Sequence, residues 1–185
     1  MSSKINVWHV VKDHFATLKN GDCYSWLDCT VFFAFPVLLS VFLAWKEVVL
    51  TKDAVSMLVN FGSIFTALLL SLLMLVYEQQ NKLEDRNKAT SGGVPFFDAK
   101  KELLDQLYSN ITFSVVMSML IVSLSLIQTM VDGHEVQLWD GWGLNSKNRL
   151  TIYVLSPILL FLTVNAILTI FMIVKRTYAL LKMKM

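Results

Sequence analysis

The residues best suited to chemistry are two cysteines and three histidines, and their spacing limits what they can do. Cys23 and Cys29 are separated by five residues, which matches neither the CxxC of a redox pair nor half of a zinc site. We therefore expect reduced, structural thiols. His9 and His14 are five positions apart and miss the i, i+4 spacing of a metal-binding pair on a helix. We expect these two histidines at a surface or an interface.

Other signs of catalysis are missing from the sequence. It contains no GxSxG, HExxH or Walker A motif, no paired-carboxylate motif and no cluster of Cys and His ligands. Its long apolar segments lack the buried carboxylate or histidine that a proton-coupled transporter needs. We expect a protein that is not an enzyme, needs no cofactor or metal, and does not couple transport to protons.

One stretch dominates the chain, the 24 residues from Ala54 to Tyr77, which contain no charged residue, histidine or proline. As a helix they would be about 36 Å long, enough to cross a hydrocarbon core of about 30 Å. The whole chain is 55% hydrophobic and 16% charged, with a mean hydropathy of +0.57. That balance leaves too little polar surface for a soluble globule.

Similar segments predict an all-α integral membrane protein, a bundle of four transmembrane helices. The expected spans are Cys29–Trp45, Ala54–Tyr77, Ile111–Val131 and Leu150–Val174. The chain then divides into an N-terminal region (1–28), a first hairpin of spans (29–77), an arm (78–110), a second hairpin with a short periplasmic loop at 132–149 (111–174), and a basic tail (175–185). Pro36 inside the short first span predicts a kink, with a gating hinge as the alternative.

The polar segments also carry patterns. Ile5, Trp8, Val11, Phe15 and Leu18 recur at helical spacing and predict an N-terminal amphipathic helix, lying on the membrane surface, on a partner or on the protein's own arm. Asn20-Gly21-Asp22 should end it. The second span should continue into the arm as a helix until Ser91-Gly92-Gly93. The apolar loop Val94–Phe97 should meet the interface or a partner, and Asp98 should cap the next helix.

Lysine and arginine placement predicts the orientation. Twelve of these residues fall in the N-terminal region, the arm and the tail, and four fall in the two short loops. Both termini and the arm should therefore face the cytoplasm, and Trp139 and Trp142 should lie at the opposite interface. The basic segments would attract anionic lipid, so they are no evidence of direct nucleic-acid binding.

Small and polar residues line one face of three spans. They are Asn60, Ser63, Ala67 and Ser71 in the second, Ser114, Ser118, Ser125 and Gln128 in the third, and Asn165 with Thr169 in the fourth. Such faces permit close helix packing within or between subunits. The alternative is a narrow polar pore in an oligomer. A four-span bundle has little interior to hide these faces, so we expect a homo-oligomer of unknown copy number.

The whole-chain plan resembles small four-span membrane proteins of bacterial anti-phage defence, most closely the membrane subunit of the Kiwa system. The similar features are the length, the amphipathic start, the two hairpins of spans and the charged arm from Glu78 to Asn110. The resemblance implies an oligomer in the bacterial inner membrane, without catalysis, that holds a soluble DNA-binding protein at the inner face. No single motif carries it, so no functional residue is transferred.

Together these patterns predict a non-enzymatic, oligomeric inner-membrane protein that recruits and positions a cytoplasmic partner, as the membrane-sensing subunit of a defence complex. The expected partner-binding residues are Trp8, Phe15, Phe96, Phe97, Lys100 and Lys101. The alternative function is a channel or holin-like effector that permeabilises the membrane by itself.

Overall fold

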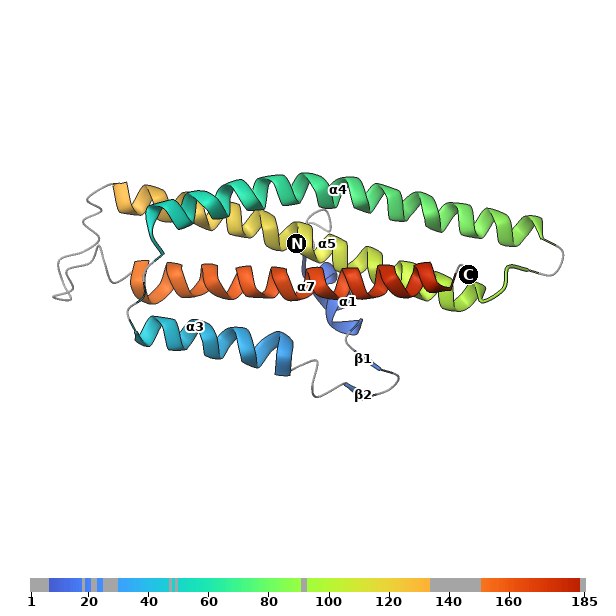
Figure 1. Ribbon diagram of the computed structural model, residues 1–185, viewed down its shortest axis with the longest axis horizontal. Coiled ribbons are helices and arrows are strands. Elements are labelled where there is room, and N and C mark those ends of the chain that lie inside the picture. Colours follow the sequence, from blue (N-terminus) through green and yellow to red (C-terminus); the bar gives the residue numbers. More distant parts are fainter. Residues whose placement is uncertain are drawn as a thin grey trace. The chain divides into compact units, whose positions relative to one another are not determined.

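The computed structural model describes residues 7–17, 19–20, 23–24, 30–46, 48, 50–90, 93–133 and 151–183. Its elements in chain order (Figure 1) are α1 (Val7–Ala16), β1 (Lys19–Asn20), β2 (Cys23–Tyr24), η2 (Thr30–Ala34), α3 (Phe35–Trp45), α4 (Lys52–Ala89), α5 (Phe97–Gly133), η4 (Thr151–Leu155) and α7 (Ser156–Lys182). The two-residue strands pair antiparallel on either side of the predicted turn. The sequence also makes predictions for Cys29, Trp139 and Trp142, and these residues lie outside the described part of the chain.

Three helices among the described residues, α4, α5 and α7, are long and apolar enough to cross a membrane. The chain is therefore compatible with a multi-pass membrane protein. Within the described residues 30–46 the predicted first span is shorter, because α3 has 11 residues and the π-helical turn η2 adds five. At 1.5 Å per residue these two elements cover about 24 Å, less than a hydrocarbon core of about 30 Å.

The burial of side chains in these helices has the pattern expected of a membrane protein rather than that of a soluble protein. Large apolar side chains such as Leu38, Met57 and Met130 are exposed. The buried positions include many polar residues, namely Ser114, Ser118, Ser125, Gln128, Ser156, Asn165 and Thr169. Water disfavours such an apolar surface, whereas lipid accepts it and forces polar groups inward. The pattern supports lipid as the surroundings of these segments.

Both prolines near span starts are preceded by a π-helical turn. η2 leads into α3, where Pro36 is one of the first two helical residues, and η4 leads into α7, where Pro157 is the second residue. Proline has no N–H and crowds the preceding turn, so the carbonyls there pair in the wider π pattern. A π-helical turn thus precedes Pro36, at the place where the sequence predicts a kink.

The arm predicted after the second span is helical on both sides of its loop. α4 continues 12 residues past Tyr77 and ends at Ala89, just before the predicted Ser91-Gly92-Gly93 stop, and Gly93 has a φ of 72°. α5 begins at Phe97, so Asp98 lies in its first turn rather than at the cap position. α7 also extends beyond Val174, which makes most of the predicted basic tail helical.

The chain forms two compact units, residues 1–25, 66–116 and 168–185 in one and 26–65 and 117–167 in the other. We call them unit 1 and unit 2. In unit 2, α3 lies beside the first half of α7 (Figure 1), with the Phe33 and Phe161 ring centroids 6.5 Å apart. Also in unit 2, α4 and α5 approach closely at Gly62. A Cβ atom there would lie 2.6 Å from a Val122 methyl and 3.3 Å from the Ser118 carbonyl oxygen.

This close approach predicts that Gly62→Val destabilises the protein. The added side chain meets Val122 and the α5 backbone, and overpacking of this kind costs about 1 to 3 kcal/mol. Thermal unfolding in detergent should therefore occur at a lower temperature. Ser56→Val is the control, since it places the same side chain at an exposed position of α4. Equal unfolding temperatures for both variants would contradict the packing described.

Candidate functional site

Helix α1 is anchored in unit 1 by His14, whose side chain is only 1% exposed. The imidazole stacks on Phe113 of α5, with ring centroids 3.9 Å apart and planes 2° from parallel. His14 Nδ1–H donates to Asn110 Oδ1 at 2.9 Å. The Asn110 amide nitrogen in turn faces Met172 Sδ of α7 at 3.1 Å. The amphipathic helix therefore packs on the protein's own arm, one of the three environments that its sequence allows.

Burial lowers the pKa of His14 from its ordinary value of 6.5 to about 4. Desolvation is the main cause, the nearby Arg176 charge adds to it, and the hydrogen bond with Asn110 opposes it. At neutral pH the ring is therefore uncharged. An uncharged ring suits a position pressed against an aromatic face, where an imidazolium would lose its hydration.

Arg176 of α7 secures the end of α1 from the other side. Its guanidinium donates to the Thr17 carbonyl at 2.8 Å and to the Gln106 carbonyl of α5 at 3.2 Å. The last carbonyls of a helix have no partner within the helix, and a cation is favoured there. The Thr17 hydroxyl lies 2.7 Å from the His14 carbonyl and 3.1 Å from Asn110 Oδ1. We call His14, Thr17, Asn110 and Arg176 the α1 clasp.

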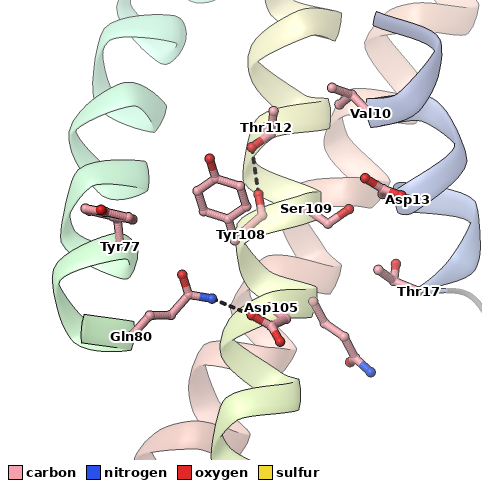
Figure 2. Close-up of a pocket in the computed structure, with 10 residues that line it drawn as sticks. Val10, Asp13, Thr17, Tyr77, Gln80, Asp105, Tyr108, Ser109 and Thr112 are labelled. Atoms are coloured by element: carbon pink, nitrogen blue, oxygen red, sulfur yellow. Dashed lines mark hydrogen bonds between the residues drawn. The ribbon is translucent and has the colours of Figure 1, made fainter. Parts of the chain in front are cut away.

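Beside the clasp, α1, α4 and α5 border an open hollow of about 610 Å³ (Figure 2). We call it the tyrosine hollow, because Tyr77 of α4 and Tyr108 of α5 both lie in it. Its described lining is polar and acidic, with no lysine, arginine or histidine. The lining residues are Val10, Asp13, Thr17, Tyr77, Gln80, Asp105, Gln106, Tyr108, Ser109 and Thr112.

The polar groups of the tyrosine hollow are only partly occupied. Asp105 accepts a hydrogen bond from Gln80 Nε2 at 2.6 Å but has no ion pair within 4 Å among the described residues. Asp13 pairs with the exposed His9 at 2.9 Å. The Ser109 hydroxyl is shielded from solvent and has no hydrogen-bond partner. Figure 2 shows Ser109 directed toward α1.

The two helices of the arm are braced by side chains across their interface. Lys101 of α5 donates to Glu84 of α4 at 2.9 Å, and Gln80 reaches Asp105 one turn further along α5. The Lys101 contact lowers the pKa of Glu84, and Glu84 raises the pKa of Lys101. Lys101 also lies 5.9 Å from the centre of the Phe97 ring. Lys101 and Phe97 thus help to hold the arm together.

A second hollow, of about 310 Å³, lies on the arm where α4 and α5 meet the end of α7. We call it the basic hollow. Its apolar lining includes Leu83, Leu104 and Leu181, and its basic residues are Lys82, Arg86 and Lys100. Lys82 pairs loosely with Glu78 at 3.5 Å, whereas Arg86 and Lys100 have no ion pair among the described residues. The basic hollow combines an apolar floor with unneutralised positive charge.

The six predicted partner-binding residues fall into two groups. Phe96 and Trp8 are exposed, at 74% and 69%, and remain available to another molecule. Phe15 and Phe97 are half-buried, Lys101 binds Glu84, and Lys100 lines the basic hollow. Phe96 stands at the tip of the arm with a φ of 56°.

The polar faces predicted for an oligomer or pore do not form one surface. Asn60, Ser63, Ala67 and Ser71 of α4 are exposed. Ser114, Ser118, Ser125 and Gln128 of α5 are buried within the single chain, as are Asn165 and Thr169 of α7. Of the predicted faces, only that of α4 is therefore left for contact with a second subunit.

Sequence reasoning missed the α1 clasp and both hollows. Asn110 and His14 are 96 residues apart, and Arg176 is 159 residues from Thr17, so no local pattern joins them. One available signal was the position of Asn110, a polar residue directly before an uncharged span. The described residues hold no group of three or more His, Cys, Asp or Glu that could bind a metal.

No protein-family model, curated protein or solved structure matches this chain.

The α1 clasp predicts that docking of α1 weakens in acid. Because the docked pKa of His14 is below its ordinary value, the docked state is favoured fully above pH 6.5 and loses stability as pH falls through about 4. The total difference is on the order of 3 kcal/mol. Hydrogen exchange of residues 7–17, corrected for intrinsic rates, should be faster at about pH 4.5 than at pH 7.

His14→Phe is the control for this effect, because it keeps a ring against Phe113 but cannot be protonated. Its α1 exchange should not respond to acid. A wild-type response that persists in His14→Phe would assign the effect to another group.

Proposed function

We propose that this protein is a non-enzymatic, oligomeric anchor in a bacterial inner membrane that recruits a soluble cytoplasmic protein to its arm. The proposal includes four spans, with both termini and the arm in the cytoplasm, on the strength of the lysine and arginine asymmetry. The observation that carries it is the exposed Phe96 at the tip of a braced helical arm.

The position of Phe96 favours a soluble partner over the membrane interface. α4 is helical from Tyr77, its last apolar span residue, to Ala89, a length of about 18 Å. The tip of the arm thus lies beyond the depth of lipid headgroups. A single aromatic side chain exposed in water at a fixed position is typical of an anchor that fills a pocket on a partner.

The basic hollow indicates the chemistry of the partner. Arg86 lies about 13 Å along α4 from Tyr77, so the hollow extends into the cytosol. Its leucine floor would accept the apolar face of a partner helix, while Arg86 and Lys100 would attract carboxylates along the edge of that helix. We infer that an acidic, amphipathic segment of the partner occupies the basic hollow.

The exposed polar face of α4 supports a homo-oligomer. Ser63 and Ser71 satisfy their hydroxyls on the carbonyls of Val59 and Ala67 of their own helix. The exposed Asn60 amide cannot do the same for all its donors and acceptors, and lipid offers it nothing. A second copy meeting α4 at this face would supply the missing partners. The same face could line a pore, so a channel remains the second candidate function.

A role in anti-phage defence, with a DNA-binding partner, rests on the resemblance in whole-chain plan to the Kiwa membrane subunit. In that role, disturbance of the membrane by phage would be sensed through the spans and passed to the partner on the arm. The arm residues Phe96, Arg86 and Lys100 would then position the partner at the inner face.

The first prediction from this proposal is that Phe96→Ala abolishes partner capture. Loss of a central aromatic anchor costs about 2 kcal/mol or more, or roughly 30-fold in affinity. The measurement is affinity capture from the membranes of cells that express the native partner. Phe171→Ala is the matched control, because Phe171 is similarly exposed, at 66%, but lies in α7. Capture that is equal in both variants would exclude Phe96 as the contact.

The second prediction concerns charge. The double variant Arg86→Glu and Lys100→Glu should release the partner, because it reverses the potential of the basic hollow. Lys88→Glu is the control, since Lys88 is exposed on the same arm but does not line the hollow. Capture should also weaken as salt is raised in the wild type. Insensitivity to both changes would exclude an acidic partner segment.

A further inference from the structure

We propose that the tyrosine hollow binds a primary ammonium group, carried by the ethanolamine headgroup of a membrane phospholipid. The proposal does not depend on the partner-recruitment function. The hollow is separate from the basic hollow and has the opposite electrostatic character, since Asp13 and Asp105 line it without any basic residue among the described lining.

The depth of the hollow in the membrane favours a lipid headgroup over a soluble amine as its ligand. Tyr77 is the last residue before the first charge of the arm, and Tyr108 and Ser109 lie two or three residues before the predicted span that begins at Ile111. These positions correspond to the headgroup layer, where tyrosines are enriched. At about 610 Å³ the hollow is large enough for a phosphoethanolamine group.

The side chains match the donors of a primary ammonium. Such a group has three N–H donors and a full positive charge. Asp105 offers a carboxylate whose only hydrogen bond in the described structure comes from a neutral amide, that of Gln80. The Ser109 hydroxyl is buried with no partner, although a buried polar group normally has one. An ammonium in the hollow would satisfy Ser109 and neutralise Asp105.

The two tyrosines can add a cation–π attraction for an organic ammonium. Tyr77 and Tyr108 approach the hollow from different helices, and their side chains share the space between α4 and α5 in Figure 2. Aromatic faces attract organic cations, and Tyr77 and Tyr108 are 51% and 40% exposed, so a headgroup can reach both rings. Lys101, the nearest lysine along α5, donates to Glu84 and does not line the hollow, although its charge also interacts with that of Asp105.

The α1 clasp keeps the hollow formed. α1 contributes Val10, Asp13 and Thr17 to its wall, and Arg176 holds Thr17 through its carbonyl. The guanidinium donates to the Thr17 and Gln106 carbonyls and is not among the residues that line the hollow. Headgroup binding and α1 docking should therefore support each other.

Native mass spectrometry of the full chain in detergent tests the proposal. The protein is given phosphatidylethanolamine and, at equal concentration, the same lipid N-acetylated on its amine, which removes the charge. We expect about tenfold more of the first lipid retained, as for a charge-assisted hydrogen bond. Equal retention of the two lipids by the wild type would overturn the proposal without any variant.

Two substitutions locate the site. Asp105→Asn and Tyr108→Leu should each remove most of this preference, whereas Asp85→Asn should keep it, because Asp85 is an exposed arm carboxylate outside the hollow. Wild-type preference in both hollow variants would overturn the assignment to this site. Displacement of the lipid by free ethanolamine at equal concentration would overturn the lipid as the source of the ammonium. Partner capture should be unchanged in Tyr108→Leu, because Tyr108 lines the hollow but takes no part in the Gln80–Asp105 and Lys101–Glu84 contacts of the arm.

Discussion

The constraint that organises this protein is that lipid cannot form hydrogen bonds, so polar groups in its apolar helices must be satisfied within the protein. Serine and threonine hydroxyls meet this demand on their own helices, as Ser63 does at Val59 and Thr163 does at Leu159. Longer side chains are placed inside, where Asn165 reaches the Phe161 carbonyl. The fully buried Gln128 amide has no hydrogen-bond partner among the described residues, so its burial lowers the stability of the fold.

The same constraint relaxes where α4 and α5 leave the apolar segments, and the features with functional potential gather there. Unit 1 combines the α1 clasp, a hollow with acidic residues and a hollow with basic residues. The α1 clasp and the two hollows all contain polar side chains that pack partly against protein. Their remaining polar surface can be solvated by water or lipid headgroups. This boundary region joins an N-terminal helix, two spans and the end of α7 through contacts between residues remote in sequence.

The sequence predicts the helices far better than the contacts between them. The uncharged run from Ala54 and the helix formers after Tyr77 were enough to predict one helix through both, and α4 confirms it. Periodicity could not predict that the Ser114 face would be buried inside the chain while the Ser63 face stays exposed, because both faces consist of small and polar residues. His14 could not be distinguished from a surface histidine, because its burial depends on Asn110 and Phe113.

Phe96, at the tip of the arm, has a positive φ of 56°. A bulky side chain with a positive φ is a strained arrangement, of order 1 to 3 kcal/mol, that glycine would adopt freely. The arm therefore gives up stability at its tip, where the 74% exposed side chain of Phe96 is held on a strained backbone. In the proposed recruitment of a partner, a backbone held in advance lowers the entropy lost on binding, at the cost of stability in the turn.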